Sequence, residues 1–400
     1  MSNHDPIDKL LDDAISGHSI LKDRRVLQTS HEPETILHRD GELAKTTQSL
    51  LPILKKSRPS NLLIYGKPGT GKTLVVKKVL EKIEKRVEKS EFPIKFVYAN
   101  AKDETTIYGL LVSFGSKIGV DLPTTGLSIS TIFKKILDHI KQNSMNVVFA
   151  IDEIDYLVEL ASKTGRDILY NLTRANENLG KDSSLTLIGI SNLLSFKERL
   201  DPRVISSLGE EEIVFTNYTV DQIKEILAER IKDAFVDNVI DASALNLCAA
   251  MAGQEHGDAR RAIDLLRVAG ELAEREGSNN VTSDHIRRAA QKMEEDKEVT
   301  ALNAYPLHEK LLIVAVMRSN GASTGEVYHT YKELCKTIRQ KEVTQRRATQ
   351  ILSDIELSGL ITGKIVHQGI HGRTKKYNLT VQPETIKKAF QNDVILADVL

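Results

Sequence analysis

One run of eight residues decides the fold of this chain: Gly66-Lys67-Pro68-Gly69-Thr70-Gly71-Lys72-Thr73. A short apolar run, residues 61–65, precedes it, and a helical pattern follows from Leu74. Glycines let the backbone turn its N–H groups toward phosphate oxygens, and the N-terminus of the next helix adds positive potential. Lys72 is expected to reach the β- and γ-phosphates, and Thr73 to offer its hydroxyl to magnesium. The run predicts a site for ATP or ADP with magnesium, formed by residues 66–74, rather than a plain glycine-rich turn.

An acidic pair follows a second apolar run. Residues 146–151 are continuously apolar and rich in β-branched side chains, which is typical of a strand buried on both faces of a parallel sheet. Asp152 and Glu153 come next, so Asp152 is predicted to hold the magnesium and Glu153 to activate the attacking water. Two acids here would also suit the N-terminus of a following helix. The phosphate loop earlier in the chain favours the catalytic interpretation.

Composition narrows the class of protein. The chain has 400 residues, 40% apolar and 28% charged, enough for two or three globular domains. No apolar run approaches the ~18 residues of a membrane span, and the first residues lack a secretory pattern. Cys248 and Cys335 lie far apart and outside any metal-binding spacing, so they are expected to be core residues in a reducing compartment. We expect a cytoplasmic, nucleoid-associated protein.

Charge is unevenly distributed along the chain. The 55 basic and 55 acidic residues cancel overall. Residues 301–400 nevertheless hold 14 Lys and Arg against 9 Asp and Glu, a net charge of +5, so the first 300 residues carry −5. This asymmetry suggests a basic C-terminal module with a polyanionic partner.

The order of patterns predicts three domains after a polar tail at residues 1–30. Residues 31–216 alternate strands and helices, with strands expected at 61–65, 94–100, 146–151 and 185–191, so we expect an α/β domain around a parallel sheet. Residues 217–298 carry only helical periodicity, at 220–233, 243–251, 258–276 and 283–292. The charged segment 292–300 is interpreted as a linker.

Residues 299–400 have the pattern of a winged helix-turn-helix. Helices are expected at 307–319, 325–334 and 344–358, with Ser323 and Thr324 as a cap for the second, and strands at 360–368 and 374–380. The third helix would enter a major groove and the hairpin would reach phosphates. The DNA-contacting residues would be Arg346, Arg347 and Gln350 on the helix, and Arg373, Thr374, Lys375 and Lys376 on the hairpin. A protein-binding winged helix is the alternative, and two basic clusters at the expected contact points favour double-stranded DNA.

Three further polar residues suit an ATPase that works in assemblies. Asn192 ends the fourth strand, where an amide would orient the lytic water, although a turn Asn is the simpler interpretation. Arg203, in the segment 201–208, is placed to face the γ-phosphate of a neighbouring subunit as an arginine finger. Arg260 opens a helix of the predicted helical domain and would report the nucleotide state, unless it is an ordinary exposed helix charge.

Together these motifs resemble the archaeal replication initiator family, which is related to origin recognition complex subunits and the cell-division-cycle helicase loader. The resemblance covers nearly all of the chain and rests on Leu37–Asp40, Gly66–Thr73, Asp152–Asp155, Ile190–Asn192, Asp201–Leu208, Gly257–Arg267 and the winged helix. It implies an AAA+ ATPase with a helical lid, slow hydrolysis used as a switch, and tightly held ADP. It also implies binding of origin DNA through the winged helix and a helical insertion after Asn100, other initiator subunits on the DNA, and recruitment of a replicative helicase. The wing departs from the family at Ile370-His371, where Arg and Gly are usual.

Two alternative functions remain open from the residues. A clamp-loader-like or branch-migration ATPase would form an obligate ring with fast, DNA-stimulated turnover. A transcription regulator would use the nucleotide only as a structural plug and would not hydrolyse it.

Overall fold

The structure is a computed structural model that describes residues 19–55, 57–88, 93–164, 168–254, 257–367 and 373–400, without the side chains of 162–164, 367, 373 and 398. The chain forms two compact units, one that ends at Ile286 and one that begins at Arg287. None of the described helices is long and apolar enough to cross a membrane.

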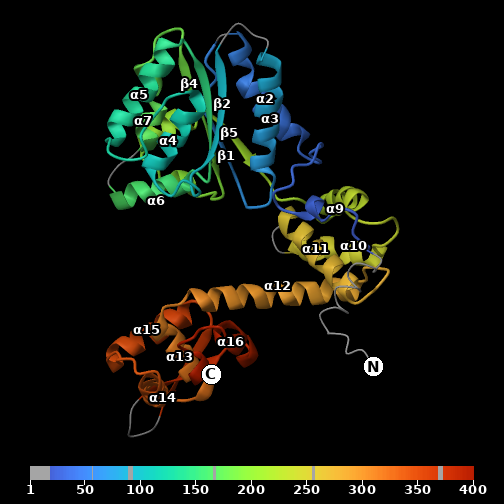
Figure 1. Cartoon of the computed structure of the whole chain (residues 1–400), viewed down its shortest axis with the longest axis vertical. Helices are drawn as coiled ribbons and strands as arrows, with labels where there is room; N and C mark the ends of the chain where they lie inside the picture. Colours follow the sequence, from blue (N-terminus) through green and yellow to red (C-terminus); the bar gives the residue numbers. More distant parts are fainter. Residues whose placement is uncertain (1–18, 56, 89–92, 165–167, 255–256, 368–372) are drawn as a thin grey trace, which may run out of the picture. The chain divides into compact units, whose positions relative to one another are not determined.

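A five-stranded parallel sheet lies at the centre of the first unit (Figure 1). Its strands are β1 (Leu62–Gly66), β2 (Ile94–Asn100), β3 (Asn146–Asp152), β4 (Ser184–Ser191) and β5 (Glu211–Phe215), in the order β2-β3-β4-β1-β5. The four strands predicted from apolar runs are confirmed to within one residue at each end. The sequence did not predict β5, which pairs with β1 and has two exposed glutamates, Glu211 and Glu212, at its start.

Helices cover both faces of the sheet (Figure 1). One face packs against α2 (Asp40–Leu50), η2 (Leu51–Lys55) and α3 (Lys72–Val87). The other packs against α4 (Ile107–Ile118), α5 (Ile129–Gln142), α6 (Asp155–Thr164), α7 (Ile168–Thr173) and α8 (Pro202–Leu208). Short 3-10 turns lie at η1 (Arg24–Leu27), η3 (Ala175–Glu177) and η4 (Phe196–Arg199). On the second face, Phe114 of α4 stacks on Phe149 of β3 with ring centroids 4.1 Å apart. Burial of both faces explains the apolar run of β3, and it leaves every residue of β4 buried.

A helical lid follows the sheet. It consists of α9 (Val220–Ala234), α10 (Ala242–Gln254), α11 (Ala259–Arg275) and the start of α12 (Ser283–Ala304). Thr219 caps α9 with a capping box. Its hydroxyl accepts from the N–H of Gln222, and the side-chain oxygen of Gln222 accepts from the N–H of Thr219. All four predicted helices are present.

The segment 292–300, interpreted from its charge as a linker, lies inside α12 and is therefore helical. Pairs of side chains three and four residues apart stabilise this charged stretch. Lys297 pairs with Glu294 at 3.1 Å, and Gln291 donates to Glu295 at 3.0 Å. Charge without apolar periodicity therefore marked a partly exposed helix rather than a loop.

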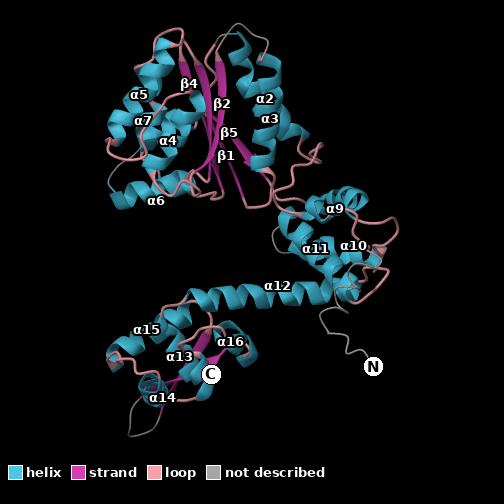
Figure 2. Cartoon of the chain, viewed as in Figure 1, coloured by secondary structure: helices cyan, strands magenta, loops and turns pink. Residues whose placement is uncertain are grey.

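The second unit contains the three helices and the hairpin of a winged helix (Figure 2). Its elements are α13 (Leu307–Arg318), α14 (Thr324–Thr337), α15 (Gln345–Leu357), β6 (Ile361–His367), β7 (Arg373–Leu379), α16 (Pro383–Phe390) and η6 (Ala397–Val399). Ser323 caps α14 as predicted. The sequence missed α16, whose Ile386 and Phe390 are buried in the core of this unit. The hairpin tip, including Ile370 and His371, lies outside the described residues.

Candidate functional site

The predicted phosphate loop lies between β1 and α3. Gly69 and Gly71 have φ angles of 72° and 89°, in the left-handed region that favours glycine. Lys72 is the first residue of α3 and only 4% exposed, and its ammonium donates to the carbonyl oxygens of Gly66 and Lys67, both at 2.8 Å. Burial lowers the pKa of Lys72 to about 8, against the opposing effect of Asp152. The loop therefore keeps a desolvated cation beside its backbone, where a phosphate would approach.

Asp152 lies at the end of β3, directly beside the loop. Its Oδ2 accepts from the hydroxyl of Thr73 at 2.5 Å and from that of Tyr98 at 2.8 Å. One carboxylate and one hydroxyl side by side are the ligands that magnesium takes in phosphate sites, where waters and phosphate oxygens complete the shell. Thr73 and Asp152 fit this ion. Tyr98, on neighbouring β2, was not predicted as part of the site. The pattern of a strand does not show which of its side chains will contact Asp152 on the next strand.

Glu153 follows in an unusual backbone conformation, with φ at 50°. Its N–H donates to Asp152 Oδ1 at 2.8 Å, which fixes the turn after β3. Its carboxylate pairs with the ammonium of Lys102 at 2.9 Å. The pKa of Lys102 is raised, chiefly by this hydrogen bond. Sequence reasoning missed Lys102, which lies in the turn after β2.

A cavity of about 130 Å³ brings the predicted groups together. It is lined by Gly69, Gly71, Lys72, Thr73, Tyr98, Asn100, Asp152, Glu153, Asn192 and Arg260. Asn192 directly follows β4, which lies between β1 and β3, so the strand order puts its amide between the phosphate loop and the acidic pair. The N–H of Asn192 donates to Asp155 at 3.4 Å.

Arg260 reaches this cavity from the lid. Asp258 caps α11 by accepting from the N–H groups of Arg260 and Arg261 at 2.8 and 3.2 Å. The N–H of Ala259 donates to the carbonyl of Gly69 at 3.4 Å, so the start of α11 contacts the phosphate loop itself. A β-carbon added at Gly69 would lie 1.7 Å from Asp258 Oδ1, and glycine is therefore required by this close approach.

A larger cavity of about 710 Å³ adjoins the loop on its lid side. The segment 28–37, Tyr218 before α9, and side chains of α3, α9 and α11 such as Ile226 and Ile263 line it. Lys77 and Glu32 form an ion pair of 2.8 Å at its edge. This cavity could not be predicted from the sequence, because a segment without a motif and three helices far apart in the chain line it.

Arg203 lies outside both cavities. Asp201 caps α8, and its carboxylate accepts two hydrogen bonds from the Arg203 guanidinium, at 3.0 and 2.8 Å. The same guanidinium lies over the ring of Tyr170, 4.8 Å from its centroid, and the side chain is 69% exposed. The role predicted for Arg203, contact with the nucleotide of a neighbouring subunit, stays a prediction.

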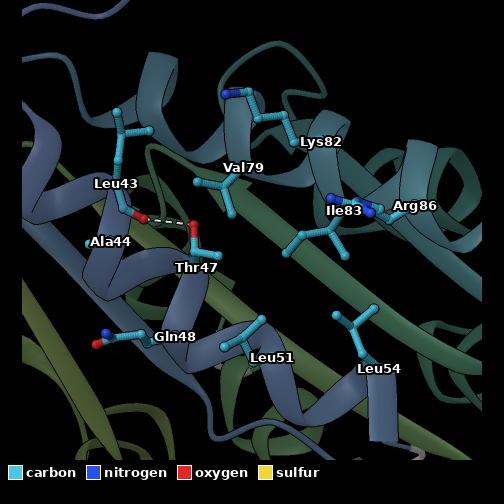
Figure 3. Close-up of a pocket in the computed structure, with 10 residues that line it drawn as sticks. All are labelled: Leu43, Ala44, Thr47, Gln48, Leu51, Leu54, Val79, Lys82, Ile83 and Arg86. Atoms are coloured by element: carbon cyan, nitrogen blue, oxygen red, sulfur yellow. Dashed lines mark hydrogen bonds between the residues drawn. The ribbon is translucent and has the colours of Figure 1, made fainter.

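A third cavity has a different character (Figure 3). It measures about 900 Å³ and lies between α2, η2 and α3, with a mainly apolar lining that includes Leu43, Leu51 and Ile83. The drawn side chains make a single hydrogen bond, from the Thr47 hydroxyl to the Leu43 carbonyl at 2.7 Å. Among the residues that the structure describes, the charged ones that line it are Lys82 and Arg86. Reactive groups converge in the small cavity instead.

The predicted DNA-contacting residues lie on α15 and the hairpin. Thr344 caps α15, and Arg346, Arg347 and Gln350 are exposed on its first turns. Arg347 donates to Gln350 at 2.9 Å. On the hairpin, Thr374, Lys375 and Lys376 are half-buried. The side chain of Arg373 is not among those described.

Lys375 and Lys376 point to opposite faces of the hairpin. Lys375 pairs with Glu356 of α15, on the face that carries the buried Tyr377. Lys376 takes part in none of the ion pairs between described residues. The two neighbours therefore differ in what they offer a polyanion.

The fold and the site define a class: an AAA-type nucleotide-binding protein with a helical lid and a C-terminal winged helix. Three family profiles match the chain, the AAA domain at residues 55–196, the Cdc6 AAA+ ATPase-type lid domain at 224–291, and the CDC6 C-terminal winged helix domain at 300–389. The chain is 63% identical to an ORC1-type DNA replication protein of Cenarchaeum symbiosum, over 100% of this chain and 98% of the other. It is 40% identical to one of Pyrococcus abyssi, over 98% and 95%.

A solved structure agrees with these matches. The Aeropyrum pernix ORC1 protein in complex with DNA is 37% identical, covers 96% of this chain and 100% of its own, and superposes with a TM-score of 0.80. The chain belongs to the archaeal ORC1/Cdc6 family of DNA replication initiator proteins.

Proposed function

We propose that this protein is an ATP-controlled initiator that binds double-stranded origin DNA, assembles there with other initiator subunits and helps to recruit the replicative helicase. The observation that carries the proposal is the 130 Å³ cavity, where the phosphate loop, the acidic pair and Arg260 of the lid meet. A site that spans sheet and lid can transmit the state of its nucleotide to the rest of the chain.

The polar residues predicted from the sequence each have a proposed role in slow hydrolysis. Lys72 would bind the β- and γ-phosphates, and Thr73 and Asp152 would hold magnesium, which neutralises charge on the phosphates when bound. Glu153 would take the proton from the attacking water, and Asn192 would orient that water. Arg260 would contact the γ-phosphate from the lid, and Arg203 would act on the nucleotide of a neighbouring subunit. The 710 Å³ cavity has the size and the mixed polar and apolar lining that suit the base and sugar.

DNA binding is proposed for the winged helix. Exposed Arg346, Arg347 and Gln350 would face the major groove, and Lys376 would contact a phosphate from the hairpin. The likeness to a relative solved with DNA supports this assignment. The helical insertion that the family resemblance implies after Asn100 would be α4, α5 and the turn between them, and we propose it as a second DNA contact.

A salt titration of origin DNA binding tests the proposal. Lys376→Ala should weaken binding to all sequences and reduce the salt slope by about one phosphate contact. Arg346→Ala, if Arg346 reads a base, should cost ~1–3 kcal/mol and relax sequence preference. Lys387→Ala on α16 is the matched control, an exposed lysine of the same unit that should change neither quantity.

Three results would contradict the proposal. Unchanged origin affinity in a variant lacking Arg346, Arg347 and Lys376 together would remove the winged helix as the main DNA contact. Fast turnover stimulated by any DNA would favour a clamp-loader-like motor, and no turnover in a single cycle would favour a regulator with a structural nucleotide.

A further inference from the structure

Arg39 carries a charge that is almost completely buried. It immediately precedes α2 and is 3% exposed. A buried guanidinium is costly unless its donors are paired, so its partners show what it is held against. The proposed hydrolysis assigns no role to this residue.

The guanidinium is bonded in three directions. Nε donates to the carbonyl of Thr70, inside the phosphate loop, at 2.9 Å. Nη2 donates to the carbonyl of Thr216, the first residue after β5, at 2.7 Å. Nη1 pairs with Glu42 on α2 at 3.0 Å. Two of the three partners are backbone atoms, one in the phosphate loop and one in the connection from the sheet to the lid.

Aromatic contacts hold the same connection. Arg39 lies over the ring of Tyr218 at 3.9 Å and that of Phe215 at 5.5 Å. Tyr218 stands directly before Thr219, the cap of the first lid helix. We call residues 216–218 the hinge segment.

The lid contacts this hinge segment closely. Gly257, in the turn before α11, has a φ of 67°, and a β-carbon there would lie 2.4 Å from the carbonyl oxygen of Tyr218. Gly71 of the phosphate loop approaches the same residue, since a β-carbon added to it would lie 2.9 Å from the Tyr218 hydroxyl. Loop, hinge segment and the start of α11 therefore meet around one guanidinium.

We propose that Arg39 is a positioning residue that couples the phosphate loop to the hinge segment, so that a nucleotide in the loop sets the position of the lid and of Arg260. This inference rests on the proposed nucleotide-binding function. A shift of the Thr70 carbonyl on phosphate binding is passed to Thr216 and Tyr218, because all three are fixed to the same planar group. By reciprocity, a change of lid position alters nucleotide affinity through the same contacts.

A distance measurement tests the coupling directly. Spin or fluorescent labels at Lys134→Cys on α5 and Asn279→Cys after α11 would report the sheet-to-lid distance, since both native positions are exposed and Cys248 and Cys335 are buried. In the parent the distance distribution should differ between the free and ATP-bound protein. In Arg39→Ala this ATP-dependent shift should be lost, with ATP affinity weakened on the order of tenfold, the size expected for a lost charged hydrogen bond.

Two further variants separate coupling from mere support of the fold. Arg39→Lys keeps a buried cation but cannot donate in two directions from a planar fork, so it should restore thermal stability but not the ATP-dependent shift. Glu42→Gln leaves both backbone contacts of Arg39 in place and should keep the shift.

The outcomes distinguish this inference from the proposed function. A full ATP-dependent shift in folded Arg39→Ala or Arg39→Lys would overturn the coupling while nucleotide binding stands. The absence of any shift in an ATP-bound parent would also overturn it. Failure of the parent to bind ATP would overturn the proposed function first.

Discussion

The ammonium of Lys102 lies 2.9 Å from the carboxylate of Glu153, the side chain that directly follows Asp152 at the end of β3. The pair holds the proposed base toward the turn after β2. The ion pair engages one carboxylate oxygen of Glu153, and we expect the carboxylate to leave this partner when it meets a water near the γ-phosphate.

We therefore predict that Lys102→Met accelerates single-turnover ATP hydrolysis about two- to fivefold, the range of an exposed ion pair. The control is Lys95→Met. Lys95 is exposed on β2, the strand before Lys102, and its replacement should leave the rate unchanged. A loss of rate in Lys102→Met, comparable with that of a Glu153 variant, would mean that Lys102 supports the reacting geometry.

Tyr98 gives a second prediction, about the metal. Its hydroxyl fixes the same oxygen of Asp152 that Thr73 contacts, and removing such an outer partner typically costs about 10–100-fold in metal affinity. Tyr98→Phe should raise the magnesium concentration needed for half-maximal hydrolysis by about tenfold and leave the maximal rate nearly intact. Tyr65→Phe is the control, because its hydroxyl bonds Glu212 instead. Identical magnesium curves for Tyr98→Phe and the parent would remove Tyr98 from the site.

The pKa of Lys72 predicts a pH dependence for ATP binding. Burial lowers this pKa to about 8 in the free protein, whereas bound phosphates would favour the charged form. ATP affinity should be constant below about pH 8 and fall above it, by up to about tenfold per pH unit, because the free lysine must first gain a proton. Calorimetry between pH 7 and 9.5 measures this. A flat affinity across that range would place the Lys72 pKa near its ordinary value.

The same shift has a consequence for stability. A lysine whose pKa is lower in the folded than in the unfolded chain destabilises the fold below the folded pKa, and this effect is relieved as the pH rises from about 8 toward 10.5. Over that interval the free energy of unfolding of the nucleotide-free parent should rise relative to that of Lys72→Met.

Arg203 and Arg260 should respond differently to dilution. Arg203 is exposed beside Asp201 and Tyr170, whereas Arg260 lines the cavity of its own chain. Arg203→Ala should lower only hydrolysis that depends on assembly, and its defect should vanish at concentrations where the parent is monomeric. The Arg260→Ala defect should persist there. Arg199→Ala, an exposed arginine shortly before α8, is the control. A concentration-independent loss in Arg203→Ala would assign it to its own subunit.

Motifs with a fixed local geometry could be predicted from the sequence. The phosphate loop, Asp152-Glu153 and the capped helix at Arg260 each combine a turn with a helix or strand end, so residue order alone places their side chains. The phosphate loop and the acidic pair lie in one cavity because β3, β4 and β1 are adjacent parallel strands. Strand β5 was missed because Glu211 and Glu212 conceal a short edge strand.

Contacts between distant segments could not be predicted in this way. Lys102, Tyr98 and Arg39 act through partners on other elements, and no local pattern marks them. The helix through residues 292–300 was missed for a different reason, because pairs of charged and polar side chains stabilise it rather than an apolar face.

The central claim is that ATP hydrolysis at this cavity controls an origin-binding initiator, and Glu153→Gln tests it most directly. Single-turnover hydrolysis should be measured with the parent and with Glu153→Gln, both saturated with ATP and bound to origin DNA. We predict that Glu153→Gln binds ATP and DNA as the parent does but does not hydrolyse the bound nucleotide. Equal hydrolysis by the two proteins would contradict it.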